Sequence, residues 1–211
     1  MSALSAQEIR ALLKEPDPEN RLTVSPILDP ERQLSENQAA LDVRLGRAFS
    51  IVRAWQQGVA EDLGAADDHG VLEPELESFV LQFGEPLIIH PHQFVLARTL
   101  EVVRLPKNLL AYVIGRSSWG RRGLIVATAV VVHPGFSGPI TLELKNVGEV
   151  PIALYPMDRI AQLTFHDVSV AGISTKVTSQ FASTFVPTLG SVRDPETYSR
   201  LKILSDRRRS G

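Results

Sequence analysis

Arginines and serines crowd a glycine-bounded stretch near the middle of the chain, which reads Gly115-Arg116-Ser117-Ser118-Trp119-Gly120-Arg121-Arg122-Gly123. Guanidinium groups and hydroxyls are donors that suit the anionic oxygens of a polyphosphate. The glycines allow a backbone to approach a ligand closely. A basic turn that satisfies only its own backbone would have the same composition, with Arg122 pointing to solvent. The stretch therefore indicates a candidate phosphate site, with the plain basic turn as its alternative.

A carboxylate lies downstream, on a segment whose pattern predicts a strand. Between Ile140 and Lys145 the alternation has period 2, so the apolar residues share one face and Thr141, Glu143 and Lys145 share the other. The simplest interpretation is a solvated strand face that carries a Glu/Lys pair. The functional interpretation makes Glu143 a general base held on a rigid element.

Metal chemistry has little support in the sequence. His90-Pro91-His92 offers two histidines without a third ligand at a plausible spacing. The chain contains no cysteine, which excludes disulfides, thiolate nucleophiles and the thiolate-bound zinc of the zinc deaminases. A Walker-type phosphate loop and a Gly-x-Ser-x-Gly elbow are absent as well. We therefore expect no protein-bound metal.

The composition is that of a soluble globular protein, with 211 residues, 44% of them hydrophobic and 22% charged. A net charge of -2 provides no broad attraction for nucleic acid or for an anionic membrane. No apolar run approaches the length of a membrane span, and the N-terminus lacks a signal-peptide pattern. We expect a cytoplasmic protein without nucleic-acid or membrane partners.

Many short strands separated by Gly, Pro or Asn predict a mainly β protein, either a barrel or a jelly roll. The expected strands are 40–46, 78–82, 87–90, 94–103, 109–114, 124–132, 140–145, 152–154 and 160–168. The first of them alternates apolar and charged residues, which predicts a half-buried strand that ends at Gly46. Ser5-Ala6-Gln7-Glu8 is a capping-box pattern that predicts an N-terminal helix, and Asp194-Pro195-Glu196 predicts the start of a C-terminal helix. We expect one domain over residues 1–211, with its core at about 39–168 and a tail from 169 to 211.

Five segments, in this order and spacing, resemble the dCTP deaminase branch of the trimeric dUTPase superfamily. They are Ala40-Leu41-Asp42-Val43-Arg44-Leu45-Gly46, His90-Pro91 through Leu105-Pro106, Gly115-Arg116-Ser117-Ser118 with Arg121 and Gly123-Leu124, Pro134-Gly135-Phe136-Ser137-Gly138 with Thr141-Leu142-Glu143, and Asp158-Arg159-Ile160-Ala161-Gln162-Leu163. The last segment resembles the fourth motif in its dUTPase spelling. The resemblance implies a distorted jelly-roll β-barrel of the dUTPase-like type, and a homotrimer whose active sites are shared between subunits.

The resemblance also implies hydrolytic deamination of dCTP to dUTP and ammonia, in pyrimidine deoxynucleotide metabolism. Mg²⁺ would bind through the nucleotide phosphates, and no zinc would take part. Carried over position by position, Glu143 would deprotonate the water that attacks C4 of cytosine, while Ser117 and Arg121 would hold that water and the tetrahedral centre. Arg121 would also favour the ionised carboxylate of Glu143. The substrate-binding residues would be Arg116, Ser118, His133, Phe136 and Gln162, of which Arg116 and Gln162 would contact phosphate.

One departure from the family lies at His133, where the family usually has an aspartate. In the dUTPases that aspartate orients the hydrolytic water, and in both branches it meets the 3′-hydroxyl of the sugar. A neutral imidazole can accept a hydrogen bond but brings no charge. The change counts most against a dUTP pyrophosphatase.

The tail departs as well. The deaminases carry a Gly- and Gln-rich segment that closes over the triphosphate, whereas Ser179-Gln180-Phe181-Ala182-Ser183-Thr184 faintly resembles the Phe-Gly-Ser-Thr lid of the dUTPases. Two alternatives to a dCTP deaminase therefore stay open. One is a dUTP pyrophosphatase or a bifunctional dCTP deaminase/dUTPase, and the other is a non-catalytic nucleotide-binding regulatory homologue.

Overall fold

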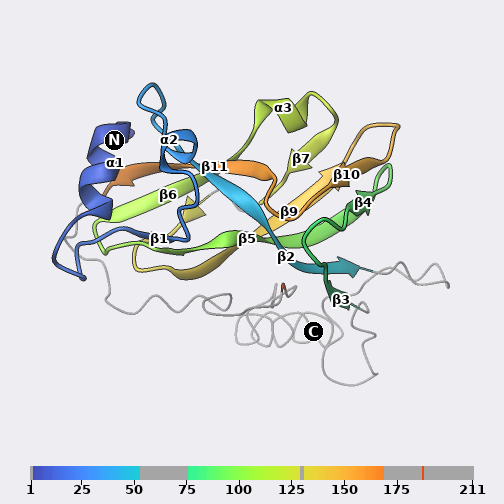
Figure 1. The fold of residues 1–211 in the computed structure, drawn as a ribbon, viewed down its shortest axis with the longest axis horizontal. Helices are drawn as coiled ribbons and strands as arrows, with labels where there is room; N and C mark the ends of the chain where they lie inside the picture. Colours follow the sequence, from blue (N-terminus) through green and yellow to red (C-terminus); the bar gives the residue numbers. More distant parts are fainter. Residues whose placement is uncertain (1, 53–75, 129–130, 169–186, 188–211) are drawn as a thin grey trace, which may run out of the picture. The chain divides into compact units, whose positions relative to one another are not determined.

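The computed structural model describes residues 2–52, 76–128, 131–168 and 187 of the chain (Figure 1). These residues are mainly in β-strands, as the sequence predicts. In chain order the elements are α1 (Ala6–Leu13), β1 (Thr23–Ser25), α2 (Pro30–Gln33), β2 (Leu41–Val52), β3 (Leu76–Val80), β4 (Leu87–Ile89), β5 (Phe94–Arg104), β6 (Leu109–Gly115), α3 (Ser117–Gly120), β7 (Leu124–Val126), β8 (Val131–Val132), β9 (Ser137–Asn146), β10 (Ile152–Leu154) and β11 (Arg159–Asp167).

Nine of the described strands form one sheet, and β4 pairs with β10 in a separate two-stranded sheet. The main path runs β7-β9-β5-β2-β11-β6-β8 through antiparallel pairs, with β1 added to β5 and β3 added to β2. The sheet curls, because β7 at one end of this path returns to β6 near the other end. A Cβ atom added to Gly115 at the end of β6 would lie 3.3 Å from the Val126 side chain of β7.

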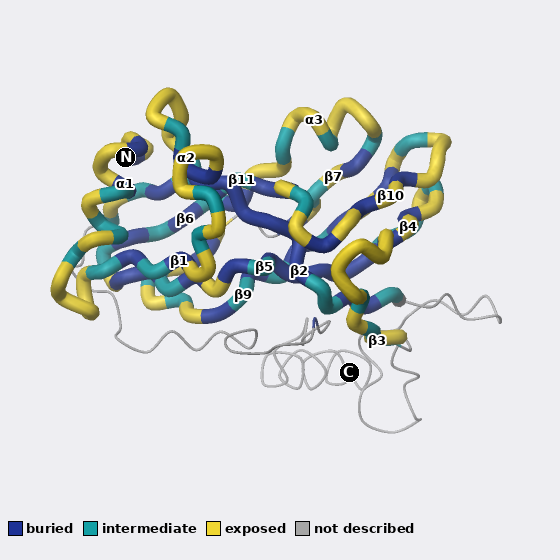
Figure 2. The backbone as a smooth tube through the Cα atoms, viewed as in Figure 1, coloured by how far each residue is buried: buried dark blue, intermediate teal, exposed yellow. Residues whose placement is uncertain are grey.

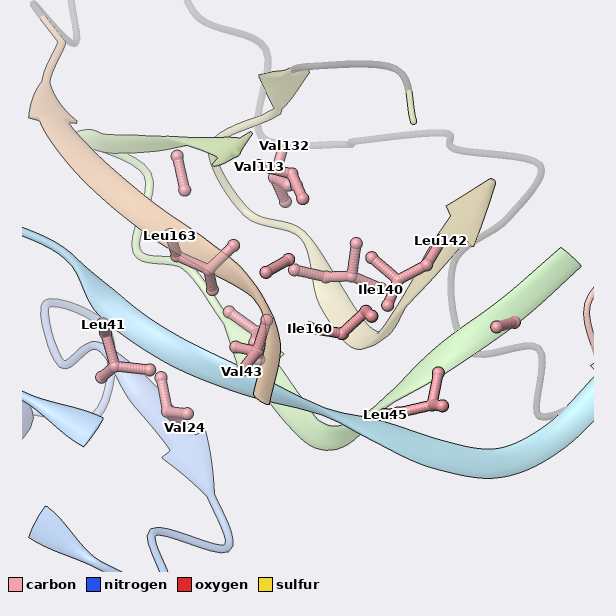
Figure 3. Close-up of a cluster of buried hydrophobic side chains, with 14 of the residues drawn as sticks. Val24, Leu41, Val43, Leu45, Val113, Val132, Ile140, Leu142, Ile160 and Leu163 are labelled. Carbon is pink, nitrogen blue, oxygen red and sulfur yellow. The ribbon is translucent and has the colours of Figure 1, made fainter. Parts of the chain in front are cut away.

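The apolar core fills the inside of this curl. Figure 3 shows side chains from β1, β2, β6, β8, β9 and β11 meeting there, among them Leu41, Ile140 and Leu163. Burial concentrates on the strands, whereas many of the connecting turns are exposed (Figure 2). Along β9 the predicted alternation is confirmed, since Ile140, Leu142 and Leu144 are buried and Glu143 is on the other face.

The predicted N-terminal helix is confirmed as α1, with both halves of its capping box. The Ser5 hydroxyl accepts from the Glu8 backbone N–H at 3.3 Å, and a Glu8 carboxylate oxygen accepts from the Ser5 backbone N–H at 2.7 Å. Together these bonds satisfy two amide groups that the helix itself leaves without partners.

Two predicted strands are wrong in detail. The strand over 40–46 neither ends at Gly46 nor is half-buried, because β2 continues to Val52 and both of its faces are covered from Leu41 to Leu45. Gly46 instead lies where β2 passes close to β5, since a Cβ atom there would be 2.9 Å from the Arg98 carbonyl oxygen. The single strand expected over 124–132 is divided into β7, which pairs with β9, and β8, which pairs with β6.

The predicted C-terminal helix and the segment 179–184 lie outside the described residues. The chain divides into two compact units, residues 1–51 with 77–188 and residues 52–76 with 189–211, and the second is almost entirely outside the described part. The organisation as one domain therefore stays a prediction. Among the described helices, none is long and apolar enough to cross a bilayer.

Candidate functional site

A buried carboxylate gathers two of the predicted phosphate-binding residues. Asp42, whose side chain is 1% exposed, accepts hydrogen bonds from the guanidinium groups of Arg116 and Arg159 and from the amide of Gln162. The Arg159 Nη1–Asp42 Oδ2 distance is 3.1 Å, and the Gln162 Nε2–Asp42 Oδ1 distance is 2.8 Å. One negative charge thus faces two positive ones, and both guanidinium groups remain partly exposed. The cluster can present a net positive charge to a ligand.

Strand register explains why these residues meet. Gln162 of β11 is directly opposite Asp42 of β2, and such cross-strand neighbours on one face are within reach of each other. Arg116 follows the last residue of β6, and its backbone N–H donates to the Ile160 carbonyl of β11 at 3.3 Å. Three neighbouring strands of the sheet, β2, β11 and β6, therefore position the cluster.

The turn that follows β6 is the short helix α3. The Arg121 N–H donates to the Ser117 carbonyl at 3.0 Å, so the two residues predicted to act on the reacting water are held in one turn. Both of them are exposed. Gly123 closes the turn with φ +88°, and a Cβ atom there would be 2.8 Å from the Gly148 backbone nitrogen. Only glycine fits this position without strain.

A pocket of about 380 Å³ opens between α3 and the start of β11. Three guanidinium groups, a hydroxyl, an indole ring and one carboxylate line it. The residues are Arg116, Ser118, Trp119, Arg122, Asp158 and Arg159. The structure thus brings Arg116 and Ser118, two of the predicted substrate contacts, to the wall of one cavity.

Glu143 occupies a different environment. It is partly buried on β9, and its backbone N–H donates to the Thr128 hydroxyl at 2.9 Å. Its carboxylate has no hydrogen-bond or ion-pair partner among the described residues. Burial raises the pKa of this carboxyl group. Arg121 forms no hydrogen bond or ion pair with this carboxylate in the described part of the chain, so its effect on the ionised form of Glu143 stays a prediction.

No hydrogen bond or ion pair within the described part of the chain joins Glu143 to Ser117 or Arg121. Their connection runs through the backbone. The strand β7 follows α3 and pairs with β9, and the Ala127 N–H donates to the Glu143 carbonyl at 2.7 Å. Glu143 therefore lies on one strand of the β7–β9 pair, and Ser117 and Arg121 lie in the turn that leads into the other.

The two remaining substrate candidates lie on the turn before β9. His133 is exposed, and its carbonyl accepts from the Phe136 N–H at 3.1 Å across a turn in which Gly135 has φ 78°. Phe136 packs partly buried against the core. Among the described residues no hydrogen bond or ion pair joins either of them to Glu143.

Sequence reasoning missed two residues of the site. Asp42 belongs to the first segment of the family resemblance, but its alternating pattern indicated a solvated charged face. Its role depends on β2 being central in the sheet. Thr128 gave no signal of its own, because only the pairing of β7 with β9 brings its hydroxyl to the Glu143 backbone.

In the described ranges, no group of three His, Asp or Glu side chains lies close enough to hold a metal ion. Asp42 is engaged by cationic and amide donors, so its oxygens are not arranged as metal ligands. The arrangement of arginine, serine and glutamine instead suits an anion, and a cation bound to that anion could be carried by the phosphate oxygens.

The chain is similar to solved and curated proteins across most of its length. It is 38% identical over 170 residues to "dCTP deaminase, dUMP-forming" of Methanothermobacter thermautotrophicus, covering 80% of this chain and 81% of that one. It is 41% identical over 167 residues to the protein of the same name from Dictyoglomus thermophilum, covering 79% and 80%. With "dCTP deaminase" of Natronomonas pharaonis it shares 42% identity over 166 residues, covering 78% and 80%.

The fold is also that of the crystal structure of 2′-deoxycytidine 5′-triphosphate deaminase from Agrobacterium tumefaciens, with a TM-score of 0.56 and 23% identity. That similarity covers 79% of this chain and 46% of the other, and it confirms the predicted fold class. The family described as dCTP deaminase-like matches residues 3–168, which includes α1 and α2 as well as the five segments. With the Asp42 cluster, the α3 turn and Glu143 all inside the matched range, the chain belongs to the dCTP deaminase-like family.

Proposed function

We propose that this protein hydrolyses the exocyclic amine of dCTP, releasing ammonia and leaving a uracil deoxynucleotide. The observation that carries the proposal is its identity of 38–42%, over about four fifths of the chain, with proteins named dCTP deaminase. The partly buried carboxylate of Glu143 supports it, since it has no partner among the residues that the structure describes and a general base must have a free lone pair to offer to water.

Glu143 would accept a proton from the water that attacks C4 of cytosine. In the balanced reaction one proton of the water ends on ring nitrogen N3 and the other on the departing ammonia, while the oxygen becomes the uracil carbonyl. One carboxylate that alternates between base and acid can make both transfers. Because burial raises the pKa of Glu143, the ionised and protonated forms of its carboxyl group are closer in free energy at neutral pH than those of an ordinary glutamate. Ser117 and Arg121 would hold the water and the tetrahedral centre.

The phosphates would bind where Arg116, Ser118 and Gln162 lie. Two guanidinium groups share the single charge of Asp42, and the resulting positive excess suits a triphosphate. Mg²⁺, when bound, would neutralise part of the phosphate charge, and we assign it to phosphate oxygens in place of protein ligands. His133 and Phe136 would meet the sugar and base, and the deamination would need no zinc.

We further propose that a neighbouring copy completes the site in a homotrimer. In the described part of the chain no hydrogen bond or ion pair joins the Glu143 carboxylate to the exposed Ser117 or Arg121, and this motivates the proposal, since a shared site would bring them together across subunits. Light scattering coupled to size exclusion should give three times the mass of 23.2 kDa. A monomer that deaminates dCTP at full rate would rule the shared site out. A cytoplasmic location stays a prediction from the sequence.

The test of function is an incubation of the purified full-length protein with Mg²⁺ and dCTP, followed by chromatographic separation of the nucleotides and an ammonia assay. Equal amounts of ammonia and a uracil nucleotide are expected. Tight binding of dCTP without product over a long incubation would identify a non-catalytic nucleotide-binding homologue instead.

A bifunctional enzyme is the second candidate, because two of these relatives carry the name "dUMP-forming". His133 in place of the family aspartate opposes it, since an imidazole brings less charge to orient a second water. The same incubation separates the two. Accumulation of dUTP supports deamination alone, whereas dUMP with pyrophosphate, formed also from added dUTP, supports the bifunctional reaction.

A further inference from the structure

Two arginines in the pocket beside α3 are given no ligand contact in the function proposed above, where Arg159 enters only through its share of the Asp42 charge. Arg116 and Ser118 line this cavity and are assigned to phosphate, but Arg122 and Arg159 line it as well. At about 380 Å³ the cavity falls within the range usual for small-molecule sites, roughly 300–1,000 Å³.

Arg122, two residues after the end of α3, is held in place by a bond to that helix. Its Nη1 donates to the Ser118 carbonyl at 2.8 Å, which directs the guanidinium along α3. A guanidinium has five N–H donors, so one backbone bond leaves most of them available. The side chain is exposed and forms no ion pair in the described part of the chain.

Arg159 comes from the opposite wall. Its Nη1 is shared between Asp42 and the Arg32 carbonyl at 3.4 Å, and the side chain is 40% exposed. The indole N–H of Trp119 donates to the Arg159 carbonyl at 2.9 Å, which joins the start of β11 to α3. This bond holds the two walls of the pocket together, and a site that is already ordered loses less freedom when it binds a ligand.

The charges of the pocket favour an anion. Three guanidinium groups line it, against the single lining carboxylate of Asp158 and the buried carboxylate of Asp42 behind. One oxygen of Asp158 is occupied by the Tyr155 N–H at 2.8 Å. Guanidinium forks match phosphate oxygens in geometry as well as in charge.

We propose that Arg122 and Arg159 bind a pyrophosphoryl group, either the terminal two phosphates of the nucleotide or free inorganic pyrophosphate. The assignment deepens the proposed function and rests on it for the identity of the nucleotide. It makes these arginines the residues that distinguish a nucleoside triphosphate from a monophosphate.

The test is calorimetric binding to the full chain with dCTP, dCMP and inorganic pyrophosphate, each with Mg²⁺. Arg122→Gln and Arg159→Gln should each weaken dCTP binding by about tenfold to a hundredfold, the loss of one hydrogen bond to a charged group, and leave dCMP binding unchanged. Asp158→Asn, which keeps an acceptor for Tyr155, should strengthen dCTP binding. Arg104→Gln is the matched control, since Arg104 at the end of β5 forms an ion pair with Glu19 and does not line the pocket.

Pyrophosphate that binds the wild type and loses affinity in Arg122→Gln would identify the free ion as a ligand. If the wild type binds dCTP more tightly than dCMP but does not bind inorganic pyrophosphate, the site takes only the phosphates of the nucleotide. Unchanged dCTP affinity in Arg122→Gln, or an equal loss for dCMP, would overturn the proposal. Because the readout is binding, failure of turnover would count against the proposed function and leave this result interpretable.

Discussion

Two carboxylates of the same sheet lie in opposite environments. Asp42 on β2 is 1% exposed and accepts from three side-chain donors on β11 and on the turn after β6. Glu143 on β9 is partly buried, has no partner among the described residues, and has a pKa raised by burial. A carboxylate that accepts from three donors can position its neighbours but has little left for a substrate. A carboxylate without partners can still accept hydrogen bonds, and a water molecule and an amine could donate them.

Glu101 on β5 shows how completely this fold satisfies a carboxylate with a structural role. Its side chain is fully buried and accepts from the Arg44 N–H at 2.8 Å, from the Arg44 guanidinium at 3.4 Å and from the Gln33 amide at 3.1 Å. Burial raises the pKa of Glu101, although the bonds from Arg44 oppose the shift. Against this background the carboxylate of Glu143, which has no partner among the described residues, is the candidate functional group.

The largest expected effect is at Glu143. Glu143→Gln should lower kcat for dCTP deamination by about 10²–10⁴-fold, the usual contribution of general acid–base catalysis. Binding of dCTP and the melting temperature should change little, because the carboxylate makes no bond that the fold needs. Glu149→Gln, at an exposed position after β9, is the matched control. A variant with near-normal turnover would remove Glu143 from the mechanism.

Glu101→Ala should act on stability in place of turnover. It leaves the guanidinium of Arg44 buried without its counter-charge, which costs about 3–5 kcal/mol in the free energy of unfolding. Urea denaturation measures the loss. Glu19→Ala, which removes an exposed partner of Arg104 and Lys107, should have a much smaller effect. Equal losses of unfolding free energy in the two variants would mean that the buried Glu101–Arg44 pair contributes no more to stability than an exposed ion pair.

Asp42→Asn should separate positioning from chemistry. It removes the charge that Arg116 and Arg159 share and replaces one acceptor oxygen with a donor. We expect KM for dCTP to rise about tenfold, within the range for losing a charged hydrogen bond, with a smaller change in kcat. Tighter dCTP binding would show that Asp42 acts mainly as an opposing charge, and the comparison with Glu143 would then need revision.

The smallest effect is a displacement of the pH profile. A general base works in its ionised form, so activity falls as pH decreases through the pKa of Glu143. Because burial raises that pKa, the acid limb of kcat/KM should lie above the pH at which an ordinary glutamate titrates, about 4.3. An acid limb at or below that value would indicate that a cation, such as Arg121 of a neighbouring subunit, faces the carboxylate in the assembly.

How much could be predicted from the sequence differs between these regions. The face on which Glu143 lies follows from period-2 alternation alone, and the capping box fixes the start of α1. The partners of Asp42 could not be predicted in this way. They depend on the pairing of β2 with β11, in which Asp42 and Gln162 are 120 residues apart, and on the pairing of β11 with β6. The same long-range packing covers both faces of β2 and carries it past Gly46. Local patterns report neighbours along the chain, whereas the partners of a buried charge come from distant strands.

The most direct measurement is a crystal structure of the Glu143→Gln variant with dCTP and Mg²⁺ in its native assembly. The account predicts that the side chain at position 143 lies within hydrogen-bond distance of the cytosine amino group or of a water beside C4. It also predicts that Ser117 and Arg121, from the same chain or a neighbouring one, contact that water. A cytosine bound away from position 143, or one with Ser117 and Arg121 remote from it, would contradict the account.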